Sequence, residues 1–146
     1  IKSERKLGEE AERRLLYLEG ELSLGNGFLE RAADFAHQLL ERCPDYPNAH
    51  ILLARVFRRQ GKIEEAWKAI NAAMENPGIS PGSRLFYNRA CYGHLIGKPA
   101  EAVFQDLIAA FNLEPKLREY AATDPDLESL RAHAAFGEVL ARPTSE

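Results

Sequence analysis

The feature that most constrains this chain is a set of small residues that recurs in phase. Gly61 follows Gly27 by 34 residues, and Gly97 follows Gly61 by 36. Three further slots keep this phase, and eleven of the twelve occupants are Gly or Ala. The other occupants are Gly20, Ala32 and Leu39 around Gly27, then Ala54, Ala66 and Ala73 around Gly61, and Ala90, Ala102 and Ala109 around Gly97. Such self-similarity indicates a stack of repeated supersecondary units.

The repeated unit reads as a helical hairpin. In the middle copy, apolar residues recur at helical spacing on both sides of Gly61. They are Leu52, Leu53, Val56 and Phe57 before it, and Ile63, Trp67 and Ile70 after it. A glycine just past a helix supplies the left-handed backbone that reverses the chain. No segment shows the alternation of a strand, so we predict an all-α chain with helices over residues 3–24, 28–42, 46–60, 63–75, 81–96 and 99–113.

These slots resemble the tetratricopeptide repeat, a helix–turn–helix unit of about 34 residues. The middle copy carries the resemblance best, through Leu53, Ala54, Phe57, Gly61, Ala66, Ile70 and Ala73. The first copy departs from the family at Glu19 and Ser23. The resemblance covers nearly the whole chain. It implies a right-handed α-solenoid of three hairpins within one domain over residues 1–146, with repeats at about 13–46, 47–82 and 83–114.

The segment after the third copy resembles the tail that closes such arrays in bacterial proteins. Its resemblance lies in residues 123–131 and in Phe136. A stack of hairpins exposes an apolar face at its end, which a capping element must cover. Asp124 suits a helix N-cap, and Pro125 suits the first helical position. We therefore expect capping helices in residues 115–141, with Leu127, Leu130, Phe136, Val139 and Leu140 over the third hairpin.

Two departures from the family in the third copy are charged. Arg89 stands where the family has Leu, and Asp106 stands where it has a large apolar residue. These slots face each other across the hairpin in the family, so we predict that the two side chains form an ion pair. The alternative is a register shift that turns both to solvent and packs Leu107 instead.

Composition excludes several classes of partner. Apolar residues make up 45% of the 146, charged residues 28%, and the net charge is −3, which is ordinary for a folded globular protein. A net negative chain is not expected to bind nucleic acid, and no apolar run approaches the ~18 residues of a membrane helix. Cys43 and Cys91 are 48 residues apart with no CxxC motif. The absence of a cysteine motif favours a reducing compartment, so we expect a cytoplasmic protein. From its charge and its short apolar runs, we expect it to bind neither nucleic acid nor membrane.

Catalytic and metal-binding patterns are missing from the sequence. The four histidines, His37, His50, His94 and His133, have neither HxxxH nor HExxH spacing. Cys43 and Cys91 read as packing residues rather than reactive thiols. We therefore predict no enzyme, no cofactor and no metal site. An enzyme with a site built from scattered residues is the third alternative for function.

The resemblance also implies a binding surface, because the first helix of each tetratricopeptide hairpin lines a concave groove. The residues that it places there and that we predict to bind peptide are Tyr17, Glu21, Ile51, Arg55, Arg58, Arg84, Tyr87 and Cys91. Leu24 and His94 fall on the same surface. Arg55, Arg58, Arg59 and Lys62 form a basic cluster, which is either a solvated face, paired internally with residues such as Glu21, or a site for acidic ligands.

One binding mode of the family is not matched. The carboxylate clamp needs Lys where this chain has Tyr17 and Ile51, and Asn where it has Glu21 and Arg55. We predict instead a scaffold that binds a protein or peptide in the groove, with acidic residues beside an apolar anchor. Since the chain begins at Ile1, we expect a module of a larger bacterial protein. The alternative is a small stand-alone chaperone that holds an extended client segment; the sequence leaves the oligomeric state open.

Overall fold

Three turn glycines have the left-handed backbone that the repeat demands. The φ angles of Gly27, Gly61 and Gly97 are +81°, +79° and +86° in the computed structural model, which describes residues 2–142. An L-residue is strained at such angles, whereas glycine is not. Every regular element among the described residues is helical, which confirms the all-α prediction. The chain forms two compact units that divide after Ile79, close to the expected border between the second and third repeats.

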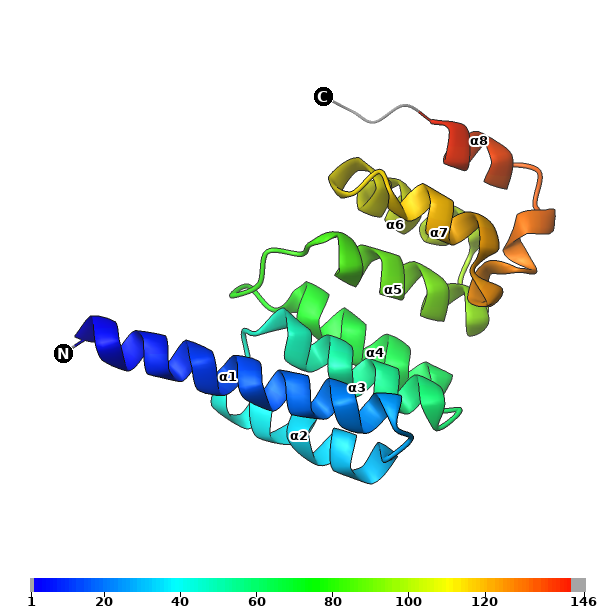
Figure 1. Ribbon diagram of the computed structural model, residues 1–146. Helices are drawn as coiled ribbons and strands as arrows, with labels where there is room; N and C mark the ends of the chain where they lie inside the picture. The colour runs from blue at the N-terminus through cyan, green and yellow to red at the C-terminus, as the bar shows by residue number, and fades with distance from the viewer. Residues whose placement is uncertain (1, 143–146) are drawn as a thin grey trace. The chain divides into compact units, whose positions relative to one another are not determined.

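The first unit contains two antiparallel helical hairpins (Figure 1). Its helices are α1 (Lys2–Gly25), α2 (Leu29–Arg42), α3 (Pro47–Arg59) and α4 (Ile63–Glu75). Each bound lies within one residue of its predicted position. The core between α1, α2 and α3 consists of Leu24, Ala32, Ala36, Leu39, Ala49, Leu52 and Val56.

Small residues set the spacing of these helices. A Cβ atom built on Gly20 would lie 2.4 Å from Cδ2 of Leu52 and 3.3 Å from Cβ of Phe35. A Cβ atom at Gly20 would therefore require Leu52, which is fully buried, to shift, so glycine lets α1 pack closely against α2 and α3. The recurring slot at Gly20 is thus explained by packing.

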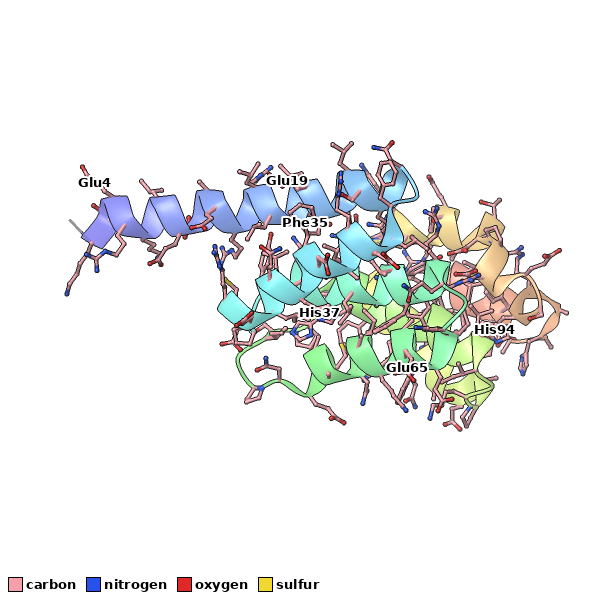
Figure 2. The ribbon with its side chains drawn as sticks, turned by 90° about the horizontal axis from the view of Figure 1, so that it is seen from below. Glu4, Glu19, Phe35, His37, Glu65 and His94 are labelled. Carbon is pink, nitrogen blue, oxygen red and sulfur yellow. The ribbon has the colours of Figure 1, made fainter. Side chains whose placement is uncertain are left out.

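The first helix is much longer than its neighbours. α1 has 24 residues, whereas α2 has 14. All residues from 2 to 12 are exposed, as their polar composition predicts, and this end of α1 projects beyond α2 (Figures 1 and 2). Several leucines on the remainder of α1 are also exposed, which the amphipathic pattern of a packed helix does not require.

The second unit contains the third hairpin and its cap. The hairpin is formed by α5 (Ser83–Leu95) and α6 (Ala100–Leu113), and the cap by α7 (Leu117–Thr123), η1 (Pro125–Leu127), η2 (Leu130–Ala132) and α8 (Phe136–Ala141). η1 packs against α5, while α7 and α8 pack against α6. The helical bounds of α5 and α6 lie within two residues of the predicted ones.

The predicted N-cap of the tail is confirmed, and four of its five predicted apolar residues are buried, whereas Leu140 is only partly buried. The carboxylate of Asp124 accepts a hydrogen bond from the backbone N–H of Asp126 at 3.0 Å, and Pro125 begins the turn. Leu127 is fully buried, and Leu130 and Phe136 are each 3% exposed. The tail therefore contributes large apolar side chains to the core of the second unit.

The charged pair of the third hairpin is confirmed as well. Arg89 Nε donates to Asp106 Oδ2 at 2.9 Å, and its Nη2 donates to Oδ1 at 2.8 Å. Leu107 is fully buried beside them, so the hairpin keeps this apolar contact together with the ion pair. A forked guanidinium and a carboxylate thus join α5 and α6 at two slots where the sequence resemblance leads us to expect apolar residues.

Candidate functional site

An ion pair joins α1 to α3 on the polar face of the first unit. Arg55 Nη1 on α3 donates to Glu21 Oε1 on α1, and the two side chains are 38% and 28% exposed. The internal pairing considered for the basic cluster therefore occurs at Arg55. Arg59 Nη1 also donates to the carbonyl oxygen of Leu24, at 3.3 Å. Two of the four cations in the cluster thus tie α3 to α1.

An aromatic pair lies farther toward the N-terminus of α1. The rings of Tyr17 and Tyr46 meet edge to face, with centroids 6.2 Å apart and planes at 81°. The guanidinium carbon of Arg13 lies 4.6 Å from the centroid of the Tyr46 ring, a favourable cation–π distance. Asn48 Nδ2 donates to the hydroxyl oxygen of Tyr46 at 3.2 Å. These contacts hold the two rings and Arg13 in one arrangement.

The aromatic pair forms the wall of a pocket of about 500 Å³. We call it the Tyr17–Tyr46 pocket. Its lining residues are Leu7, Glu10, Ala11, Arg13, Arg14, Tyr17, Leu18, Tyr46 and Asn48. Two guanidinium groups and one carboxylate leave the lining with a formal charge of +1. The pocket therefore offers cations for a carboxylate next to apolar and aromatic surface.

Local sequence explains how the pocket forms. Arg13 and Tyr17 are four residues apart on α1, so their side chains lie on one face of the helix. Tyr46 precedes α3, where its backbone N–H donates to the carbonyl of Cys43 at 3.0 Å and its own carbonyl accepts from Ala49 N–H at 3.1 Å. This tight turn between α2 and α3 returns the Tyr46 ring to α1.

The structure brings together only part of the predicted binding set. Tyr17, Glu21, Arg55 and Arg58 lie on α1 and α3, and each is partly exposed. Arg84 is exposed in the first turn of α5 in the second unit. Ile51, Tyr87 and Cys91 are 2%, 5% and 3% exposed, so these three side chains offer almost no surface to a partner. Leu24 is likewise a core residue, at 1%.

The buried positions of Tyr87 and Cys91 follow from the cap. The Tyr87 hydroxyl donates to Asp124 Oδ2 at 2.6 Å, and Cys91 Sγ lies 3.8 Å from the same oxygen. Burial raises the pKa of Tyr87 and of Cys91 above their ordinary values, with the nearby Asp124 carboxylate acting in the same direction. The thiol is thus held in its unreactive form, and this cluster fastens η1 to α5.

Sequence reasoning identified only Tyr17 among the nine lining residues of the pocket and missed the other eight, including Arg13, Tyr46 and Asn48. The i,i+4 spacing of Arg13 and Tyr17 was an available signal on the first helix. Tyr46 had no such signal, because its approach to α1 depends on the geometry of the turn after α2.

Neither a metal-binding cluster nor a membrane-spanning helix occurs among residues 2–142. No group of three or more His, Cys, Asp or Glu side chains there is arranged to hold a metal ion. In the same part of the chain, no helix combines the length and the apolar character needed to cross a bilayer.

Comparison with known proteins gives no family model that matches the chain and no curated protein that matches its sequence. Function is therefore inferred from the pocket and the helices that surround it.

Proposed function

We propose that this chain is a protein-interaction module that binds a peptide with acidic residues beside an apolar anchor. The observation that carries the proposal is the Tyr17–Tyr46 pocket, where the guanidinium groups of Arg13 and Arg14 adjoin two tyrosine rings. Arginine forms forked hydrogen bonds with carboxylates, and tyrosine offers a large contact area for little loss of side-chain entropy. Both features are enriched at the energetic centres of protein interfaces.

The charges on this face favour the pocket over the basic cluster as the place where the acidic residues bind. Glu21 already compensates Arg55, so a ligand carboxylate would have to displace an internal partner there. Arg13 is stacked on Tyr46, which leaves its N–H groups able to donate within the plane of the guanidinium. An acidic side chain would bind near Arg13 and Arg14, and the apolar anchor would contact Tyr17 and Leu18.

The scaffold we propose for this site is a tetratricopeptide array. Three helical hairpins with left-handed turn glycines, small residues at the close contacts and a capping tail support this assignment. We propose that the hairpins stack as a right-handed solenoid and that the protein works in the cytoplasm as a module of a larger protein. In this scheme α1 and α3, which are the first helices of the two hairpins in the first unit, present the peptide site.

The proposal is tested by measuring binding to a library of fluorescent peptides that vary in charge and in their apolar residue. We expect peptides with both acidic and aromatic or aliphatic residues to bind best. Arg13→Glu combined with Tyr17→Ala removes a cation and a ring, and should weaken binding by roughly 10- to 100-fold, since a hydrogen bond to a charged group contributes about 1.5–3 kcal/mol. Affinity should also fall as salt rises, because partly exposed charges are screened.

The matched control is Arg5→Glu, which makes the same charge change on an exposed turn of α1 that does not line the pocket. It should leave the affinity within about twofold of the wild type. Equal binding by the Arg13→Glu, Tyr17→Ala variant and the wild type would overturn the proposal, provided that circular dichroism shows both to be folded.

A further inference from the structure

An exposed stripe of apolar residues follows the outer face of α1. Leu7, Leu15, Leu18 and Leu22 are 66%, 55%, 50% and 67% exposed, and Ala11 lies between the first two of them. At about 100° per residue these five positions fall within an arc of about 80°. We call them the leucine stripe. The opposite face of α1, with Gly20, Ser23 and Leu24, is buried in the first unit. The stripe is therefore not part of the face through which α1 packs in the fold.

The spacing of the stripe is typical of a coiled coil. Ala11, Leu15, Leu18 and Leu22 follow one another by four, three and four residues, which are the d, a, d and a positions of a heptad repeat. Packing within the first unit differs in kind, because small residues such as Gly20 and Ala32 occupy its close contacts. Leucines at a and d instead form the interdigitating seam between two helices.

We infer that the leucine stripe is the interface between two copies of this chain, whose α1 helices pair in parallel. The charged residues beside the stripe indicate both that the partner is a second copy and that the two helices run in parallel. With Leu15 and Leu22 at a, Arg14 occupies a g position and Glu19 the next e position. In a parallel pair, the g residue of one helix meets this e residue of the other. A two-fold axis thus creates two pairs between Arg14 and Glu19 of the second copy.

The alternative direction is disfavoured by the same charges. In an antiparallel pair with the same leucine layers, Glu12 of one copy lies near Glu19 of the other, where like charges repel. Arg14 lies near Glu21, whose carboxylate already pairs with Arg55. Glu19 is partly exposed on α1, so its carboxylate can reach a second copy. Glu12 is already paired with Arg42.

The length of the stripe predicts a modest affinity. Leu7 and Leu22 are fifteen residues apart, which corresponds to about 22 Å along a helix. A single seam of this length buries less than the roughly 800 Å² per partner of a standard stable interface. We therefore expect a reversible dimer whose population depends on protein concentration. This inference does not rest on the proposed peptide site, since it concerns the protein alone.

The first experiment is sedimentation velocity over a concentration series that reaches the high micromolar range. We expect the wild type to change from monomer to dimer as its concentration rises. Leu15→Glu combined with Leu22→Glu should weaken association at least 10-fold, because it places charges in two layers of the seam. Both residues are exposed and lie outside the core of the first unit, so circular dichroism should show the variant to be folded.

The matched control is Leu113→Glu, which changes a leucine that is 58% exposed on α6. It should dimerise like the wild type. The inference is overturned if the wild type stays monomeric over the whole series, or if the Leu15→Glu, Leu22→Glu variant associates as strongly as the control. Either result would assign the stripe to another partner or to another segment.

A charge swap tests the parallel direction. Arg14→Glu alone and Glu19→Arg alone should each weaken the dimer, because each places like charges at both g–e contacts. The combined Arg14→Glu, Glu19→Arg variant should restore association, since opposite charges meet again. A combined variant that associates no better than either single change would overturn the parallel pairing.

Discussion

The ion pair between Arg89 and Asp106 gives the sharpest prediction about stability. It joins α5 to α6 through two hydrogen bonds of 2.9 and 2.8 Å, and the side chains are 27% and 14% exposed. Asp106→Ala removes the carboxylate and leaves the guanidinium partly buried without this partner. The double variant, Arg89→Leu with Asp106→Leu, replaces both charges by apolar side chains.

The burial of the two side chains determines the expected magnitude. Exposed ion pairs contribute about 0.2–1 kcal/mol, whereas removing one partner of a fully buried pair costs about 3–5 kcal/mol. Since this pair lies between these limits and nearer the buried one, Asp106→Ala should lower the free energy of unfolding by about 2–3 kcal/mol. The double variant leaves no unpaired charge, so it should remain within about 1 kcal/mol of the wild type.

Urea unfolding followed by circular dichroism measures both variants. The chain supplies a matched control in Arg42 and Glu12, which also join two helices but are 55% and 57% exposed. Glu12→Ala should therefore cost less than about 1 kcal/mol. The reasoning is refuted if Asp106→Ala costs no more than Glu12→Ala, or if the double variant is as unstable as Asp106→Ala.

Two substitutions and one thiol-reactivity measurement test other contacts. Gly20→Ala should lower the melting temperature and cost about 1–3 kcal/mol through overpacking, because the added methyl would lie 2.4 Å from a leucine methyl of α3. Asp124→Ala should cost about 2–4 kcal/mol in urea unfolding, since it removes an N-cap and leaves the Tyr87 hydroxyl buried without its acceptor. In native protein, a thiol reagent should modify the half-buried Cys43 well before Cys91, which is 3% exposed and has a raised pKa. Equal rates would contradict the burial of Cys91 beside Tyr87 and Asp124.

The cluster of Tyr87, Cys91 and Asp124 also predicts how the free energy of unfolding depends on pH. The pKa of Tyr87 is raised above its ordinary value of 10, first by burial and then by its acidic neighbours. The folded state therefore disfavours the phenolate, and this contribution is fully present below pH 10. The free energy of unfolding should fall as the pH rises above 10, where the unfolded chain loses the proton and the folded one keeps it. Tyr87→Phe should reduce this fall; an unchanged pH profile in that variant would contradict the assignment.

The elements that sequence predicted well are those fixed by local rules. The helix bounds follow from amphipathic spacing and from turn glycines, which act within a few residues. The pair of Arg89 and Asp106 could also be predicted, because both residues lie in one hairpin whose register the repeat defines. Asp124 was identifiable as a cap from its proline neighbour alone.

The site was harder to predict because its parts are brought together by turns and by the tail. The resemblance assigned Tyr87 and Cys91 to an open groove, but Asp124, more than thirty residues later, packs against them. Tyr46 reaches Arg13 only through the turn after α2. Periodicity reports which side of a helix is apolar, yet it does not report which distant segment will cover that side.

The two proposed functions of α1 are physically linked. Leu7, Ala11, Arg14 and Leu18 belong both to the pocket lining and to the proposed dimer contact, so one surface cannot serve two occupants at once. A peptide that binds only the monomer stabilises it by RT ln(1 + [L]/Kd), which at 100 times Kd is about 2.7 kcal/mol per subunit. That energy is enough to dissociate a micromolar dimer into peptide-bound monomers. Because α1 packs in the fold through its other face, exchange between these occupants requires no change in the core of the first unit.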